Sequence, residues 1–419
     1  MSQQAADQEE QANQYQASSR ALHAFCKSLP KIELHAHLNG SIRDETLVQL
    51  ARERGVKLPP EFHAGSHTNR DPSLFLNSKP RSLADCFHIF SFIPKCVTDV
   101  AALERITREA LEDAADDNIC YIELRTGPKI LFHEGETCTK QDYLGTIVRV
   151  MDSFERKELD RYEAETANQQ SGTSSETRLP LIPRLIVSVD RSKTVDEAYE
   201  NVDLAIELKN SGCKQIVGVE IGGNPAKNDF RDFVPVFTKA RQHGLPISIH
   251  CGEVPMARES LDRDLVRAHE EAMSILQFRP DRLGHSLLVS EDVSQILDEI
   301  LIPVEVCPTS NVLTLDSNNE EDCLLKGIQN HPQLRKWLSS KYPISLNTDD
   351  AGIFATTLTR EYTLVANAFH LSEGDLSKML IGSVDTIFDP EKEKLKQAIT
   401  TRVNKILVLE NVKPPTPSF

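Results

Sequence analysis

Eight short runs of apolar, mostly β-branched residues recur along this chain, each beside a turn-forming residue. The runs are KIELHAHL (31–38), CYIELRTG (120–127), IPRLIVSVD (182–190), IVGVEIGG (216–223), PISIHCG (246–252), RLGHS (282–286), PVEVCPTS (303–310) and PISLNTDD (343–350). Runs of this length and composition are typical of strands buried on both faces. The pattern therefore predicts eight buried β-strands.

The stretches between most of these runs carry apolar residues at helical spacing. Clear examples cover residues 99–117, 195–212, 230–244 and 291–300. Nearly continuous apolar strands that alternate with helices indicate a parallel sheet covered by helices. Eight such units favour an α/β fold of the (β/α)8 barrel type, here with extra helices after the first strand, and active sites of such barrels lie at the carboxyl ends of the strands. An open, doubly wound sheet is the alternative fold.

The segments outside this pattern are polar. Residues 1–20 are rich in Gln, Ala and Glu, which predicts a disordered N-terminal tail. The tract YEAETANQQSGTSSETR (162–178) predicts a mobile surface insertion. The end VKPPTPSF (412–419) cannot continue a helix. We therefore expect one barrel domain over residues 21–411, flanked by two tails.

Composition narrows the class of protein. Hydrophobic residues make up 39% and charged residues 26% of the 419 positions, as in globular proteins with a sizeable core. The formal net charge of −16 argues against a nucleic-acid binder. No run approaches 18 apolar residues, the start of the chain lacks an apolar signal segment, and the nine cysteines form no CxxC pair. We expect a cytosolic monomer with reduced cysteines and no membrane span.

Polar residues gather at the carboxyl ends of the apolar runs. In chain order they are His35 and His37, Asp190, Gly223, His250 and Glu253, His285, Ser310, and Asp349 and Asp350. One such residue is commonly structural, because a strand that turns into solvent often ends in Asp or Ser. Four histidines and two adjacent aspartates on one rim favour a functional site.

Three imidazoles and one carboxylate on this rim suit a divalent metal. His35 and His37 are two residues apart and share one face of a strand. With His250 and Asp349 they form a four-ligand set for which zinc is the first choice. A metal of this kind lowers the pKa of a bound water enough to supply hydroxide near neutral pH. Glu253 is spaced to act as an acid on the loop after the fifth strand.

Five motifs identify a resemblance to a known family. HAHLNGS, HCGE, LGHS, CPTSN and NTDD, in this order and spacing, resemble the adenosine/AMP deaminase family over roughly residues 26–410. The longer stretches LPKIELHAHLNGS and NTDDAGIFATTL are similar to its N6-methyl-AMP deaminase branch, the adenosine deaminase-like proteins. The resemblance implies a zinc-dependent hydrolase acting at C6 of a purine 5′-monophosphate, with N6-methyl-AMP and water giving IMP and methylamine. The fold it implies is the barrel of metal-dependent hydrolases.

The resemblance also assigns roles to the rim residues. It implies one zinc per chain on His35, His37, His250 and Asp349. The implied catalytic residues are Glu253, which gives a proton to purine N1, His285, which orients or deprotonates the attacking water, and Asp349. The implied substrate contacts are His37, Asn39, Thr126, Gly127, Pro128, Lys129, Asp190, Gly223 (to the purine), Glu253 and Asp350 (to N7).

The chain departs from the branch at a few positions. Glu220 and Asn224 stand where the branch usually has aspartate, and Pro94 stands where a contacting histidine is expected. These positions affect the finer substrate contacts, not the metal chemistry. Asn39 stands where a carboxylate would repel a 5′-phosphate, which favours a nucleotide as substrate.

Other classes of protein fit the sequence less well. Cytidine-type zinc deaminases carry an H-x-E motif together with PCxxC. The single H-x-E in this sequence is His269-Glu270-Glu271, which lies in a helical run that we expect to be solvated, and PCxxC is absent. The phosphate-binding loop GxxxxGK[ST] and the serine-hydrolase motif GxSxG are also absent. Ordinary adenosine deaminase, another metal-dependent amidohydrolase, and an inactive barrel that serves as a binding protein stay open. The inactive barrel would predict loss of a ligand or of Glu253, and all are present.

Overall fold

Eight parallel strands form the centre of the molecule. The computed structural model describes residues 17–58, 81, 83–169, 177–254, 261–315 and 324–411. The strands, in their order around the sheet, are β1 (Lys31–His37), β2 (Ile119–Thr126), β5 (Ile182–Asp190), β6 (Ile216–Gly222), β7 (Ile247–Cys251), β8 (Arg282–His285), β9 (Val304–Val306) and β10 (Ile344–Leu346). Each pairs in parallel with the next. All eight predicted strands are present.

The sheet closes on itself where β10 meets β1. A parallel bridge pairs Ala36 with Asp349. The backbone N–H of His37 donates to the carbonyl of Asp349, and the N–H of Asp349 donates to the carbonyl of His35, both at 2.8 Å. The architecture is therefore the (β/α)8 barrel and not the open doubly wound sheet.

Side chains continue this closure below the bridge. The backbone N–H of Leu34 donates to Oδ1 of Asn347 at 2.9 Å. The backbone N–H of Thr348 donates to Oε2 of Glu33 at 3.0 Å. Two buried polar side chains thus replace the ladder bonds that the short strand β10 does not supply.

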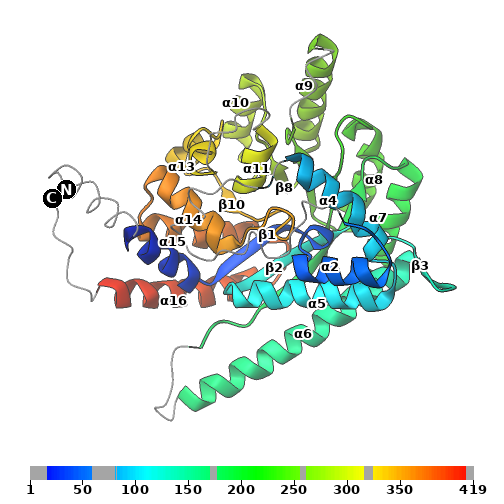
Figure 1. The fold of residues 1–419 in the computed structure, drawn as a ribbon. Helices are drawn as coiled ribbons and strands as arrows, with labels where there is room; N and C mark the ends of the chain where they lie inside the picture. The colour runs from blue at the N-terminus through cyan, green and yellow to red at the C-terminus, as the bar shows by residue number, and fades with distance from the viewer. Residues whose placement is uncertain are drawn as a thin grey trace, which may run out of the picture.

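Helices cover the outside of the barrel (Figure 1). They are α2 (Asp44–Glu53), α4 (Leu83–Cys96), α5 (Val100–Asp116), α6 (Lys140–Gln169), α7 (Val195–Asn210), α8 (Phe230–Gln242), α9 (Leu261–Phe278), α10 (Glu291–Ile300), α11 (Pro308–Leu315), α12 (Leu324–Gln329), α13 (Leu334–Ser340), α14 (Leu358–Phe369), α15 (Glu373–Ser383) and α16 (Lys392–Asn411). Short 3-10 turns are η1 (Leu38–Gly40) and η3 (Val384–Thr386), and β3 (Leu131–His133) pairs with β4 (Glu136–Cys138) as a hairpin. Because α2, α4 and α5 lie between β1 and β2, the predicted extra helices are present.

The local sequence explains these helices. In α7 the side chain of Thr194 accepts a hydrogen bond from the backbone N–H of Glu197, which caps the first turn. Val202 and Ile206, four residues apart, turn one face of the helix into the core. Gly212 follows the helix with φ of +85°, a conformation in which a side chain would be strained. No helix in the described part of the chain combines the length and apolar character that crossing a membrane requires.

Two segments expected to be irregular are partly helical. Residues 17–20, assigned to the N-terminal tail, begin a helix that runs to residue 28. Ser19 in this helix is buried, and its Oγ donates to Asn367 at 3.3 Å. Residues 162–169 of the expected insertion continue α6, where Arg161 binds Glu165 one turn later at 2.9 Å. The remaining residues 1–16, 170–176 and 412–419 of these segments lie outside the described part.

The inside of the barrel carries a network of buried charges. Nε of Arg282 donates to Glu305 at 2.6 Å, and its Nη2 donates to Glu123. Nη2 of Arg125 donates to Glu305 at 2.8 Å. Burial alone would raise the pKa of Glu305, but the guanidinium groups of Arg125 and Arg282 hold it well below its ordinary value. The barrel thus keeps an ionised carboxylate directly beneath its carboxyl-end rim.

Candidate active site

The four predicted metal ligands meet at the carboxyl ends of the strands. His35 and His37 lie at the end of β1, His250 lies in β7, and Asp349 follows β10. Nε2 of His35 is 3.1 Å from Nε2 of His250 and 3.5 Å from Oδ1 of Asp349. Nε2 of His37 is 3.4 Å from the same Asp349 oxygen. Three imidazole nitrogens and one carboxylate oxygen therefore face a common point.

Buried carboxylates hold the far sides of two of these rings. Nδ1 of His35 is 2.6 Å from Oε2 of Glu305, and Nδ1 of His250 is 3.0 Å from Oε2 of Glu220. Glu305 accepts a hydrogen bond from Nδ1 of His35, and the carbonyl oxygen of Ile221, 3.1 Å away, accepts one from Nδ1 of His250, so each Nδ1 carries a proton and each Nε2 faces the common point. Carboxylate–histidine pairs of this kind are typical of metal sites.

The contact between the two Nε2 atoms tests whether a metal fits. Two lone pairs 3.1 Å apart repel each other unless a positive charge lies between them. Burial works against a charged ring at His250, but Glu220 raises the pKa of His250 above its ordinary value. A divalent cation between the two atoms would supply that charge. The donor set therefore fits a metal such as zinc.

Two glycines allow the histidine rings to approach the strands. A Cβ atom at Gly284 would lie 2.9 Å from Cε1 of His35, and one at Gly222 would lie 3.0 Å from Cε1 of His250. Distances this short would displace the rings. Both positions therefore require glycine for the site to keep its geometry.

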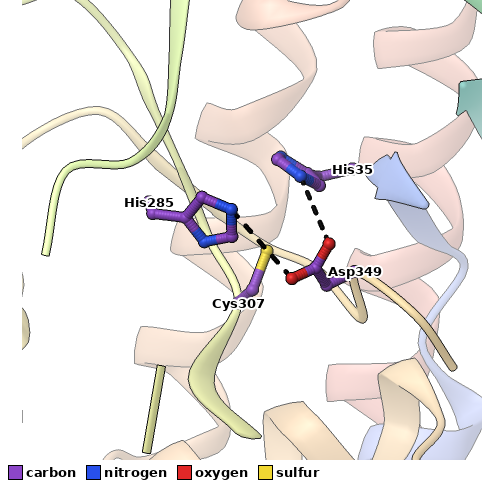
Figure 2. Close-up of side chains that lie close together, drawn as sticks. All are labelled: His35, His285, Cys307 and Asp349. Carbon is purple, nitrogen blue, oxygen red and sulfur yellow. Dashed lines mark ion pairs between the residues drawn. The ribbon is translucent and has the colours of Figure 1, made fainter. Parts of the chain in front are cut away.

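His285 and Cys307 complete the floor of the site. Figure 2 shows His35 and His285 directed at Asp349, with Cys307 beside them; one donor atom from each of the four lies within 4.8 Å of the others. Nε2 of His285 is 4.0 Å from Oδ2 of Asp349 and 3.8 Å from Oε1 of Glu253. Burial, reinforced by Asp349, raises the pKa of Cys307 well above its ordinary value, so this side chain is a neutral thiol.

The backbone is strained at the same place. His285 and Ser286 have φ of +59° and +47°, and Asp349 has φ of +63°. Residues other than glycine seldom adopt this left-handed region, and such strain concentrates at functional sites. Here it directs His285 and Asp349 into the site.

Three carboxyl groups at the site have different proton affinities. Burial raises the pKa of Glu253, although His250 opposes the shift. Burial also raises the pKa of Asp350 well above its ordinary value, and the charges of Asp349 and Glu253 add to this. Burial acts in the same direction on Asp349, but the surrounding histidines keep the pKa of Asp349 well below its ordinary value. Glu253 and Asp350 are suited to hold protons, and Asp349 is suited to stay ionised.

The predicted contacts at the ribose-phosphate end partly converge. Nδ2 of Asn39 donates to Oγ1 of Thr126 at 3.1 Å and to the hydroxyl of Tyr143 at 3.4 Å. Thr126 ends β2, and Gly127 and Pro128 follow it at the rim. Asn39 and Thr126 therefore form one polar cluster beside the predicted metal ligands, supported from below by the buried Tyr143.

A second group of predicted contacts lies farther along the rim and is exposed. Gly223 has φ of +91°, and a Cβ atom there would lie 2.6 Å from Oδ1 of Asp190. Desolvation lowers the pKa of Lys129, and the carboxylate of Asp190 opposes this shift. Gly223, Asp190 and Lys129 are all exposed, so they are accessible to a ligand that enters from solvent.

The sequence reasoning missed several residues of the site. Glu305 was noted only as part of an apolar run and Glu220 only as a departure from the related branch, although a carboxylate in the middle of a buried strand requires a partner. That requirement is the signal that could have found them. Tyr143 and Cys307 carry no comparable signal, because helix and strand patterns treat them as core residues.

The H-x-E stretch is only partly solvated. His269 binds Asp292 at 2.6 Å, and both of these side chains are exposed. Glu271, expected on the same solvated face, is buried and accepts hydrogen bonds from Arg191 and from the backbone N–H of Phe230. None of these three residues belongs to the candidate site.

Comparison with known proteins gives consistent results. The family model described as Adenosine deaminase matches residues 30–406. The Arabidopsis thaliana protein named N6-mAMP deaminase is 34% identical over 375 residues, which cover 89% of this chain and 96% of that protein. The Homo sapiens N6-Methyl-AMP deaminase is 27% identical over 383 residues, or 89% and 93% of the two chains.

A solved structure has the same fold. The crystal structure of Arabidopsis ADAL complexed with IMP superposes with a TM-score of 0.67 at 31% sequence identity, and the match covers 91% of this chain and 97% of that chain. The barrel described above is therefore shared with a protein that holds a purine nucleotide.

Proposed function

Because this chain belongs to the adenosine deaminase family, we propose that it is a zinc-dependent hydrolytic deaminase of purine 5′-monophosphates that converts N6-methyl-AMP and water to IMP and methylamine. The observation that carries the proposal is the convergence of three histidines and one aspartate on a single point, with Glu253 at the same site. An inactive barrel has no need to keep this whole set.

The chemistry follows from the proton affinities of the site. His35, His37, His250 and Asp349 would hold zinc, which when bound would supply an activated water near neutral pH. As the water oxygen bonds to C6, negative charge moves onto N1, and the protonated carboxyl of Glu253 is suited to give N1 a proton. N6 takes up the proton that the attacking water gives up, the C6–N6 bond breaks, and methylamine leaves. The protonated Asp350 can donate a hydrogen bond to N7, which orients the ring.

The preference for a nucleotide rests on the cluster around Asn39. The cluster presents an amide and two hydroxyls, from Thr126 and Tyr143, and no carboxylate. Groups of this kind hydrogen-bond to phosphate oxygens, and the exposed Lys129 adds a positive charge on the same rim. The relatives named N6-methyl-AMP deaminases and the relative solved with IMP support this assignment.

The test compares substrates on purified, zinc-loaded protein. We expect kcat/KM for N6-methyl-AMP to exceed that for AMP, and both to exceed that for adenosine by orders of magnitude. A preference for adenosine would identify an ordinary adenosine deaminase instead. Bound metal without turnover of any 6-substituted purine would identify an inactive binding protein. We also propose that the protein is a cytosolic monomer that binds no nucleic acid. Light scattering tests whether it is a monomer.

A further inference from the structure

A chain of buried hydrogen bonds with a fixed direction lies behind His285. It begins at His331, whose Nδ1 accepts from the backbone N–H groups of Gln333 at 3.2 Å and Leu334 at 3.0 Å. A backbone N–H can only donate, so Nδ1 of His331 carries no proton. Burial lowers the pKa of His331 to about 4, so the ring is neutral near pH 7. Its single proton is therefore on Nε2.

The direction passes from His331 to His285 through Asn311. Nε2 of His331 is 3.3 Å from Oδ1 of Asn311, which must be the acceptor because Nε2 carries the proton. The amide nitrogen of Asn311 then faces Nδ1 of His285 at 3.2 Å and donates to it. His285 and Asn311 have no exposed surface and His331 has 3%, so water does not compete for these bonds.

The proton of His285 is thereby placed on Nε2, the atom that faces the site. This nitrogen has no hydrogen-bond partner among the described residues, and the nearest carboxylate oxygens, on Glu253 and Asp349, lie 3.8 and 4.0 Å away. Both distances exceed a hydrogen bond. A fully buried donor without an acceptor is costly, and here it points to the place between Glu253 and Asp349.

We propose that Asn311 and His331 are positioning residues that hold His285 as the Nε2–H tautomer, so that His285 orients the attacking water by donating a hydrogen bond and does not take its proton. This inference rests on the proposed hydrolytic deamination. In this tautomer Nε2 has no lone pair for a proton, and the lone pair on Nδ1 is occupied by Asn311 and faces away from the site. Because this donor is fixed, the attacking water is held with one lone pair facing His285.

The substitution Asn311→Asp tests the direction of the chain. Aspartate keeps the shape and still accepts from His331, but it presents a carboxylate oxygen to Nδ1 of His285 and so favours a proton there. ¹⁵N-histidine NMR of the zinc-loaded protein, assigned by the signal lost in His285→Gln, should show Nε2–H in the wild type and Nδ1–H in Asn311→Asp. We expect kcat to fall roughly 100-fold or more, with KM and zinc content nearly unchanged. A wild-type His285 with its proton on Nδ1 would overturn the proposal.

A matched pair at His331 gives an independent test. In His331→Gln the amide can accept from the backbone and donate to Asn311, so most of kcat and the Nε2–H signal should remain. In His331→Leu neither bond is possible, Asn311 is free to turn over, and kcat should fall toward the Asn311→Asp value at equal zinc content. Equal kcat and equal NMR signals in the two variants would contradict the proposal. Because the NMR measurement needs no substrate, it stands even if the proposed substrate is wrong.

Discussion

Nδ1 of His35 lies 2.6 Å from Oε2 of Glu305, and neither side chain has any exposed surface. Glu305 is in turn held by two arginines from other strands, Arg125 and Arg282. The orientation of a rim histidine is thus determined by charges in the middle of the barrel. This relationship makes metal affinity depend on a residue that is not itself a ligand.

Replacing Glu305 with glutamine should weaken metal binding. The variant loses the charge that fixes the His35 ring, and removal of such a partner lowers metal affinity by roughly 10- to 100-fold. Chelator competition measures this change. The matched control is Glu123→Gln, which also removes a buried partner of Arg282 but does not contact a histidine. If both variants lose metal affinity equally, the effect comes from barrel stability and not from His35.

Removing a metal ligand should abolish metal binding and activity together. In His250→Ala the remaining two histidines and Asp349 cannot supply the lost bond. Metal analysis and turnover on the same sample check this expectation, and wild-type protein stripped by a chelator should recover when zinc is returned. Full activity of metal-free protein would refute the metal assignment.

Glu253→Gln should separate binding from catalysis. The amide keeps the shape of the side chain but cannot deliver a proton, so turnover should fall roughly 100-fold or more while zinc and substrate still bind. Nearly normal turnover would move the acid role to Asp350.

The same residue predicts a pH dependence. Burial raises the pKa of Glu253 above its ordinary value, and the acid works only while it is protonated. Wild-type kcat/KM should therefore fall as the pH rises through this pKa, and the residual activity of Glu253→Gln should lack this alkaline decline. An identical decline in both proteins would assign it to another group.

Asn39→Asp should act selectively on nucleotides. A carboxylate near the 5′-phosphate costs about 4 kcal/mol for each charge pair at about 4 Å in a medium of ε about 20. The kcat/KM for N6-methyl-AMP should drop much more than that for adenosine, with zinc content unchanged. The control is Ile130→Asp, which adds the same charge after β2 at an exposed side chain to which no role is assigned. A selective loss in the control as well would point to the net charge of the rim instead of Asn39.

The strands could be predicted because both of their faces are buried. All seven residues of β6 are buried, and its sequence is apolar except for Glu220. The start of the first helix could not be predicted in the same way. Ser19 is buried against Asn367, 348 residues away, and no local pattern reports such a contact.

The end of α6 was missed for a different reason. Residues 162–169 are polar on nearly every side, so composition does not distinguish a solvated helix from a loop. The helix is supported by ion pairs one turn apart, such as Arg161 with Glu158 and Glu165. Their contribution is small and is visible only once the helical spacing is assumed.

The rim of the site was predictable and its support was not. His35, His250 and Asp349 stand at strand ends, where barrel geometry brings them together. Asn311 and His331 act through bonds whose directions depend on the backbone around residue 334. Such directions come from three-dimensional packing, and the residue types alone do not contain them.

The proposed metal ligands also lie across the seam of the barrel. His35 and His37 come from the first strand and Asp349 follows the last, beside a junction where Leu34 meets Asn347, 313 residues later in the chain. A half-barrel cannot assemble this site, so metal affinity develops only when the ring closes. A bound ion then links the first and last strands of the sheet, and its binding energy opposes separation of these two strands. Loss of metal should therefore speed amide hydrogen exchange first along β1 and β10, before the opposite wall of the barrel.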